Sequence, residues 1–448
     1  MENKRLQNFT EGSILLPLVR FSLPVLAALF LQAMYGAVDL LIVGRFGLPA
    51  DVSAVSTGSQ IMMTMTNLIA SFAMGATILL ARQIGEGKAE EGGETIGTSI
   101  LLFAVIGTIL TLLFVPGASV VASIMRAPIE AFSLTVSYIR ICGAGMLVII
   151  AYNLIGSVFR GIGDSVTPLI TVTIACICNI AGDLLFVGVL GKGAAGAAAA
   201  TVMAQAASVV LSLLLIRRKP LPFSLQPSMV RFHKKKVKTI THLGLPIALQ
   251  DFLVSISFLI ILMIVNTLGV IASAGVGVAE KVCVFIMLVP IAFMQSLSAF
   301  VGQNAGAGKL DRGEKALRYS IMMSLVFGVI MFFIAFFHGD MLASIFSKDS
   351  EVAFAGGDYL KAYGIDCMLT PIFFCFLGFY NGIGKTRFVM IQGVIAAFLI
   401  RVPVSFFMSR QVPVSLFHIG LAVPCSSVLQ IILCLLYMAY VKRTMMRK

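Results

Sequence analysis

Long apolar stretches separated by short polar segments follow one another along almost the whole 448-residue chain. Each stretch is long enough for a membrane-spanning helix, which needs about 20 mainly apolar residues. None of them alternates between polar and apolar residues with a period of two, so the pattern favours helices over the strands of a barrel. The sequence therefore predicts an all-α integral membrane protein with twelve transmembrane helices, at about 14–43, 52–80, 95–116, 133–158, 166–190, 194–216, 239–268, 274–300, 317–338, 354–380, 387–409 and 415–441.

The composition agrees with a lipid environment. Hydrophobic residues make up 59% of the chain and charged residues only 12%, whereas soluble domains carry about one quarter charged residues. The first apolar stretch is too long for a removable signal peptide and lacks a cleavage site, so we expect it to remain as a transmembrane helix.

The basic residues are distributed unevenly between the two sides of the predicted membrane topology. Of the 33 Lys and Arg, 23 fall on the side that holds both termini and five on the other side. Because basic loops stay in the cytoplasm, we expect both termini to be cytoplasmic in a multi-pass protein of the plasma or inner membrane. The basic segment 217–238 is predicted to be a cytoplasmic linker against anionic lipid, which we favour over a nucleic-acid site.

The second half of the chain repeats the first. "LP" at 23–24 recurs as "LP" at 245–246, at an offset of 222. At an offset of 221 the identical pairs include Gly85/Gly306, Lys88/Lys309, Tyr138/Tyr359, and the run Gly161-Ile162-Gly163 with Gly382-Ile383-Gly384. Any shared helix packing raises chance matches among Gly and Ile, but the lysine and tyrosine pairs do not have this explanation.

The repeat predicts a two-lobe architecture. Six helices separate matching points, so both halves enter the membrane in the same direction and a pseudo-twofold axis runs along the membrane normal, as in many transporters. We expect an N-lobe at 1–216, the basic linker at 217–238 and a C-lobe at 239–448. Pro24 and Pro246 occupy equivalent places in helices 1 and 7, where each removes a backbone donor and is predicted to act as a hinge.

Polar residues in the first half recur every three or four residues, so each set lies on one face of its helix. Such faces indicate either a shared hydrated interior or interhelical hydrogen bonds, and we favour the second for Ser and Thr. The sets are Gln32, Tyr35 and Asp39 in helix 1, Gln60, Thr64 and Asn67 in helix 2, Asn179 and Asp183 in helix 5, and Thr201 and Gln205 in helix 6.

The two carboxylates of this half point to a cation-coupling site. An ionised Asp at the centre of a membrane helix costs about 2.5–3.5 kcal/mol, and no Lys or Arg lies at the depth of Asp39 and Asp183 in these helices. Two carboxylates that share a low-dielectric pocket favour the retention of one proton. Their oxygens, together with Asn179 and Thr201, also suit sodium. We expect no other metal site.

The second half contains buried acids whose role the sequence leaves open between drug binding, ion binding and pairing with Lys281 or Arg401. Abundant Phe and Met suit weakly specific binding of bulky apolar cations, although ordinary packing accounts for most of them. The candidate substrate-cavity residues of this half are Asp251 and Ser255 on helix 7, Glu280 on helix 8, and Asp366 and Thr370 on helix 10.

No motif indicates an enzyme. There is no G-x-x-x-x-G-K-[ST], H-E-x-x-H or G-x-S-x-G pattern, and the G-x-G-x-x-G match at 191–196 opens a membrane helix without a βαβ unit. The eight Cys are scattered and interpreted as small apolar residues. We therefore expect neither catalysis nor a cofactor, apart from a coupling ion.

Several motifs together resemble the multidrug and toxic compound extrusion (MATE) family along essentially the whole chain. They are "LP" near the start of each lobe, "YGAVDLLIVGRFG" (35–47), "ARQIGEGKAEE" (81–91) answered by "GQNAGAGKLDRGE" (302–314), "VFRGIGDSVTP" (158–168) answered by "FYNGIGKTR" (379–387), and "RVP" (401–403).

The resemblance implies a monomeric antiporter that exports organic cations in exchange for protons or sodium ions by alternating access. In the family an acid in helix 1, an Asn/Asp pair in helix 5 and a Thr in helix 6 form the N-lobe cation site, and these positions match Asp39, Asn179, Asp183 and Thr201. A lipid-linked precursor flippase of the same superfamily is the alternative, but its cavity is expected to be more cationic.

One branch of the family, the NorM-like branch, emphasises acids in helices 7 and 10. Those positions fall at Val254 and Thr370 here, although Asp251 and Asp366 lie about one turn away. The chain therefore resembles the MepA-like and DinF-like bacterial branches more than the NorM-like branch.

Overall fold

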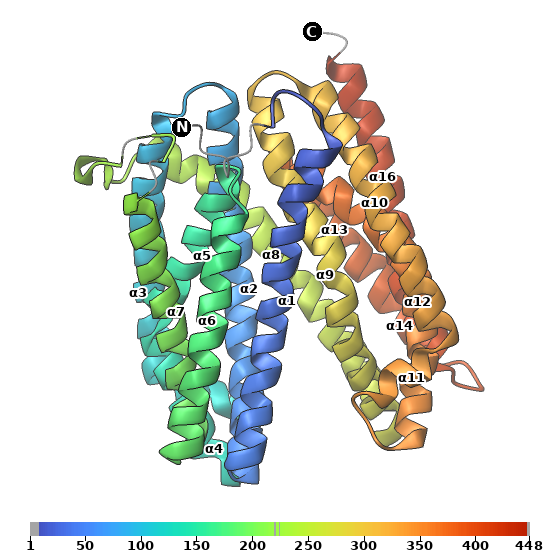
Figure 1. Ribbon diagram of the computed structural model, residues 1–448. Coiled ribbons are helices and arrows are strands. Elements are labelled where there is room, and N and C mark those ends of the chain that lie inside the picture. Colours follow the sequence, from blue (N-terminus) through green and yellow to red (C-terminus); the bar gives the residue numbers. More distant parts are fainter. Residues whose placement is uncertain (1–8, 219–220, 224, 446–448) are drawn as a thin grey trace. The chain divides into compact units, whose positions relative to one another are not determined.

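The computed structural model describes residues 9–218, 221–223 and 225–445, and within these ranges every regular element is a helix (Figure 1). Among the described residues eleven spans are single helices or nearly continuous helical segments, and a twelfth is a bent pair. In the first half they are α1 (Leu15–Phe46), α2 (Pro49–Gly85), α3 (Glu91–Ile124), α4 (Ile129–Ala144) with α5 (Met146–Gly161), α6 (Val166–Asp183) with the π-helix η1 (Leu184–Val189), and α7 (Gly193–Arg218).

The spans of the second half follow a short 3₁₀ turn, η2 (Pro227–Met229). They are α8 (Lys234–Asn266), α9 (Val270–Gly306), α10 (Leu310–Phe337), α12 (Ser350–Gly382), α13 (Thr386–Ile395) with the π-helix η3 (Ala396–Arg401) and α14 (Val402–Ser409), and α16 (Ala422–Met445), with the short helices α11 (Gly339–Ser344) and α15 (Leu416–Gly420) between them.

The structure confirms an all-helical membrane protein. Eleven helical spans are long and apolar enough to cross a membrane, and the pair α4–α5, bent by 54°, makes a twelfth. Several helices extend beyond the apolar stretches that predicted them: α2 ends at Gly85 and α3 at Ile124, whereas the apolar stretches end near 80 and 116. The extension of α2 contains Arg82 and Gln83, so hydropathy does not mark it as part of the span, and the extension of α3 follows Pro116 within the helix.

The chain divides into two compact units. The first consists mainly of Arg20–Ala248 and the second mainly of Leu249–Ala305 and the chain from Lys309 on. In the first unit α2 packs against α3, α4 and α5, and α6 packs against α7. In the second unit α12 is central and contacts α10, α11, α15 and α16.

Two glycines of the first unit bring α2 and α8 into direct backbone contact. A Cβ atom added to Gly244 would lie 2.2 Å from the carbonyl oxygen of Phe72, and one added to Gly75 would lie 2.5 Å from that of Ile240. Because main-chain atoms lie on both sides of this contact, no rotamer change makes room for a larger residue.

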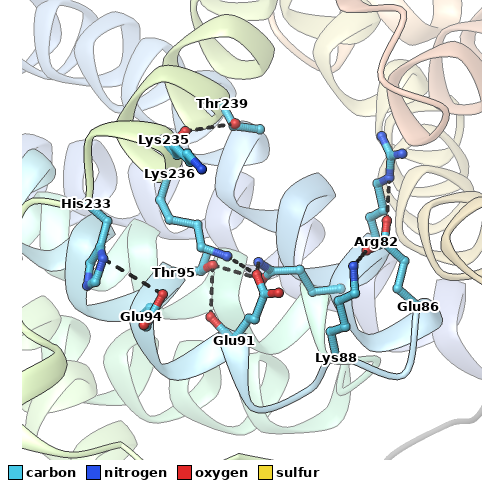
Figure 2. Close-up of polar contacts among 11 residues, drawn as sticks. Arg82, Glu86, Lys88, Glu91, Glu94, Thr95, His233, Lys235, Lys236 and Thr239 are labelled. Atoms are coloured by element: carbon cyan, nitrogen blue, oxygen red, sulfur yellow. Dashed lines mark hydrogen bonds and ion pairs between the residues drawn. The ribbon is translucent and has the colours of Figure 1, made fainter.

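The end of the predicted linker and the first turn of α8 are docked along the first turns of α3 (Figure 2). Lys236 forms an ion pair with Glu91, and His233 lies 3.8 Å from Glu94. The Thr98 hydroxyl donates to the carbonyl of Arg231 at 3.1 Å. Phe223 is buried where a Cβ on Gly92 would be. The linker is therefore held by main-chain contacts as well as by charge.

Gly97→Ala is expected to loosen this docked linker. A Cβ at position 97 would come within 2.2 Å of the carbonyl oxygen of Met229, so the linker backbone must move away. Overpacking of this kind costs about 1–3 kcal/mol. Limited trypsin digestion should cleave the linker several-fold faster than in the wild type. Gly117→Ala in the same helix, where a Cβ meets nothing within 4 Å, is the control, and equal cleavage of both variants would contradict the docking.

Candidate functional site

Three helices of the first unit bring the four candidate coupling residues together. Asp39 comes from α1, Asn179 and Asp183 from α6, and Thr201 from α7. The Thr201 hydroxyl donates to Oδ2 of Asp39 at 3.3 Å, and the Asp39 carboxyl also interacts with the side chains of Asp183 and Asn179. Asp39 is 3% exposed, and Asn179 and Asp183 are fully buried. The spacing of four residues in α6 places its two members on one face.

The polar atoms of this cluster are short of partners. Oδ1 of Asp39 and both polar side-chain atoms of Asn179 and Asp183 are buried without a well-formed hydrogen bond among the described residues. Within the same part of the chain, no Lys, Arg or His forms an ion pair with either carboxylate. Each such unsatisfied group costs about 1–3 kcal/mol, and more for a charge, so the cluster favours a ligand with positive charge.

The chemistry of the donors limits what that ligand can be. Two carboxylates, one amide and one hydroxyl are oxygen ligands for a proton or a hard cation. Among the described residues no group of three His, Cys, Asp or Glu side chains is placed to hold a metal ion, so the cluster is unlike a zinc site.

A π-helical segment follows Asp183 directly. The α-helical hydrogen bonding of α6 ends at Asp183, and η1 continues the span from Leu184 to Val189. π-helical segments inside α-helices are rare and are found frequently at functional sites. The apolar sequence after Asp183 gives no signal for this segment.

A second polar layer lies one turn away from the cluster. Nε2 of Gln205 donates to the Tyr35 hydroxyl at 3.4 Å, and both residues are four positions from Thr201 and Asp39, respectively. Nε2 of Gln32 donates to the Tyr152 hydroxyl at 3.0 Å. The sequence prediction missed Tyr152. Its only signal was the Tyr-Asn pair at 152–153 within an apolar stretch.

The helix 2 candidates are not joined to this cluster. Gln60 and Asn67 are exposed, and Thr64 donates its hydroxyl to the carbonyl of Gln60 at 2.9 Å within its own helix. No hydrogen bond between these three side chains and the Asp39 cluster is present in the part of the chain that the structure describes.

The candidates of the second unit fall into separate groups. The Thr370 hydroxyl donates to Oδ2 of Asp366 at 2.7 Å, and both residues are buried in α12. Asp251 and Ser255 are exposed on α8, where the Ser255 hydroxyl donates to the carbonyl of Asp251 at 2.8 Å. Glu280 is partly buried on α9, and its Oε1 has no hydrogen-bond partner among the described residues.

Arg401 is buried in the second unit without a direct ion pair. Its guanidinium donates to the hydroxyls of Ser257 and Ser426 at 3.1–3.2 Å and lies 4.5 Å from the ring centroid of Phe258. Asp366 is close enough to interact electrostatically with the guanidinium of Arg401. No described carboxylate oxygen lies within 4.0 Å of that guanidinium. The sequence had allowed a direct ion pair between Arg401 and one of the buried acids, and the described residues contain no such pair.

Comparison with known families explains the repeat. The MatE family model matches residues 24–185 and again residues 246–407, which is well over half of the chain. The chain belongs to the MatE family. The two matched segments have equal length and begin 222 residues apart, so each half of this MATE-family chain carries one copy of the family's unit.

Relatives and solved structures agree with this assignment. The probable multidrug resistance protein YpnP of Bacillus subtilis is 25% identical over 403 residues, which cover 88% of each chain. The multidrug export protein MepA of Staphylococcus saprophyticus is 22% identical over 91% of this chain and 90% of its own length. A crystal structure of MATE in complex with MaL6 has a TM-score of 0.91 at 20% identity and covers both chains completely. The protein is therefore a MATE-family membrane transporter and not an enzyme.

Proposed function

We propose that this MATE transporter is a secondary active multidrug efflux antiporter that exports organic cations in exchange for protons or sodium ions. The main support is the Asp39–Asp183 cluster: Oδ1 of Asp39 and both carboxylate oxygens of Asp183 are buried without a well-formed hydrogen bond among the described residues, which favours a cation there. Relatives of this chain are named multidrug resistance and multidrug export proteins.

We assign the roles within the cluster from the four-residue spacing of Asn179 and Asp183 and from the hydrogen bond between Thr201 and Asp39. Asp39 and Asp183 bind the coupling ion, Asn179 orients the carboxyl of Asp183 on the same helix face, and Thr201 orients that of Asp39 through its hydrogen bond. An ion that moves down 100 mV supplies about 2.3 kcal/mol per charge, before any concentration gradient is counted. Binding and release of this ion would alternate with binding and release of drug.

Other features of the transporter remain part of the proposal. The chain works as a monomer in the plasma or inner membrane, with cytoplasmic termini and with lobes at 1–216 and 239–448 joined by the linker 217–238. It stands nearer to the MepA-like and DinF-like branches than to the NorM-like branch. Residues proposed to contact drug are Gln32, Tyr35, Gln60, Thr64, Asn67 and Gln205 in the first half, and Asp251, Ser255, Glu280, Asp366 and Thr370 in the second.

Pro24 and Pro246 are proposed as hinges because each lies inside a long helix, α1 and α8. Each proline removes one backbone hydrogen bond and favours bending at that point. Pro24→Ala is expected to slow drug export several-fold without loss of folded protein, measured as the initial rate from loaded vesicles. Unchanged export in this variant would exclude the hinge in α1.

Export from proteoliposomes tests the function directly. Vesicles that hold the purified protein and a fluorescent organic cation are given an inward proton gradient in one series and an inward sodium gradient in another. Faster loss of the dye under one gradient, compared with protein-free vesicles, would support the proposal and name the ion. No loss under either gradient would contradict it, and a lipid-linked precursor would then be the cargo to test.

A further inference from the structure

Arg401 is held as a bound cation would be. Its guanidinium is surrounded by the hydroxyls of Ser257 on α8 and Ser426 on α16 and by the face of Phe258, and the residue is 4% exposed. The titratable groups around it are Asp366, Tyr359 and Tyr363, all on α12. A guanidinium does not deprotonate in proteins, so this positive charge is permanent.

The repeat places Arg401 at the position of Asn179. The family segments, 24–185 and 246–407, are offset by 222 residues, and this offset relates Asn179 to Arg401 and Asp183 to Ser405. Burial supports the same register: Ala175, Asn179 and Asp183 are buried at intervals of four, and so are Ala397, Arg401 and Ser405.

The π-helix η3 explains how this register arises. Gly163 and Gly384, before the two spans, are offset by 221 residues, whereas the two family segments end at 185 and 407, an offset of 222. A π-helical turn accommodates one extra residue within an α-helix, and η3 covers Ala396–Arg401. The inserted residue brings Arg401 to the buried face on which Asn179 lies in the first half.

The acids of the first cluster have no counterpart in the second half. At the same offset Asp39 corresponds to Ile261, which is fully buried, and Asp183 corresponds to Ser405. Tyr35 corresponds to Ser257, which accepts a hydrogen bond from Arg401. One half thus combines two carboxylates with no fixed cation, and the other combines a fixed cation with no carboxylate at the matching positions.

We propose that Arg401 is a tethered cation: its guanidinium supplies a fixed positive charge in the second half, at the level that Tyr35 has in the first half and about one turn from the positions that match Asp39 and Asp183. This inference rests on the proposed ion-binding role of the Asp39 cluster. The second half then stays loaded with positive charge throughout the transport cycle, and the chain has a single exchangeable coupling site.

Chemical rescue tests whether the position is a cation site without relying on transport. Arg401→Ala leaves a cavity lined by hydroxyls and the Phe258 ring, which free guanidinium can fill. The melting temperature of the purified variant in detergent should fall relative to the wild type. Millimolar guanidinium chloride, far below denaturing concentrations, should restore most of the loss, whereas the neutral isostere urea should not.

A matched control separates this effect from a general response to guanidinium. Arg410 also lies over an aromatic ring, 5.1 Å from the centroid of Phe406, but it is exposed. Arg410→Ala should melt like the wild type and should not respond to guanidinium. Equal rescue of Arg401→Ala by guanidinium and urea, or rescue by neither, would overturn the tethered cation.

A second variant keeps the proposal testable if Arg401→Ala does not fold. Arg401→Lys retains the charge, and Arg401→Met retains the length without it. In proteoliposomes that export the dye, Arg401→Lys should keep the wild-type ion-to-drug ratio, whereas Arg401→Met should lose most export. Wild-type export by Arg401→Met would contradict the proposal. Absence of export by the wild type itself would instead indicate that the proposed function fails.

Discussion

Replacement of Asp183 by asparagine is expected to abolish ion-coupled export while leaving the protein folded. The variant removes one of the two carboxylates that we propose share the coupling ion, and interactions with a charged group contribute about 1.5–3 kcal/mol each. The affinity for the coupling ion should fall by about tenfold or more. The initial rate of dye export under the effective ion gradient is the measurement.

The stability of Asp183→Asn should not fall with its export activity. Both carboxylate oxygens of Asp183 are buried without a well-formed hydrogen bond among the described residues, so a neutral amide removes an unfavourable charge. The melting temperature of Asp183→Asn should equal or exceed that of the wild type. Asp340→Asn, the same change at an exposed site, should alter neither quantity. Wild-type export by Asp183→Asn would show that the buried acid is structural.

Gly244→Ala is expected to be the most destabilising of the conservative substitutions considered. The added methyl group would lie 2.2 Å from the carbonyl oxygen of Phe72, and one added at the facing Gly75 would lie 2.5 Å from the carbonyl oxygen of Ile240 in α8. The two helices must separate, at a cost of about 1–3 kcal/mol or more, because no side chain can rotate away. Thermal unfolding in detergent should show a melting temperature several degrees lower than that of the wild type.

Gly36→Ala provides the comparison for this prediction. Gly36 is also in a membrane helix of the first unit, but a Cβ there meets nothing within 4 Å. Alanine favours a helix over glycine by about 0.8–1.0 kcal/mol, so this variant should melt at or above the wild-type temperature. Equal melting of the two variants would mean that α2 and α8 are not in backbone contact.

The sequence predicted the spans well because each is a long apolar segment, and lipid imposes that pattern directly. It also predicted that Asp39, Asn179, Asp183 and Thr201 could meet, since polar residues at helical spacing are costly in lipid and must find one another. The structure brings these four residues together, while their role in ion coupling stays a prediction.

Three features of the structure could not be predicted from the sequence: the π-helical segments, the docking of the linker and the partners of Arg401. The π-helical segments η1 and η3 arise within ordinary apolar sequence, and a one-residue change in register is invisible to a hydrophobic periodicity. The docking of the linker on α3 depends on Gly97, whose missing side chain matters only beside the carbonyl of Met229. The hydroxyl partners of Arg401 are serines separated by more than a hundred residues, and only the folded chain shows which ones meet.

Hydroxyl groups that are hydrogen-bonded within their own helix can still bind a positively charged molecule. Thr64 and Ser255 each donate their only hydroxyl proton to a carbonyl of the preceding turn. Each hydroxyl oxygen then has only lone pairs to offer, so it accepts hydrogen bonds and does not donate them. An ammonium group can donate to such an oxygen, whereas an anion finds no donor there.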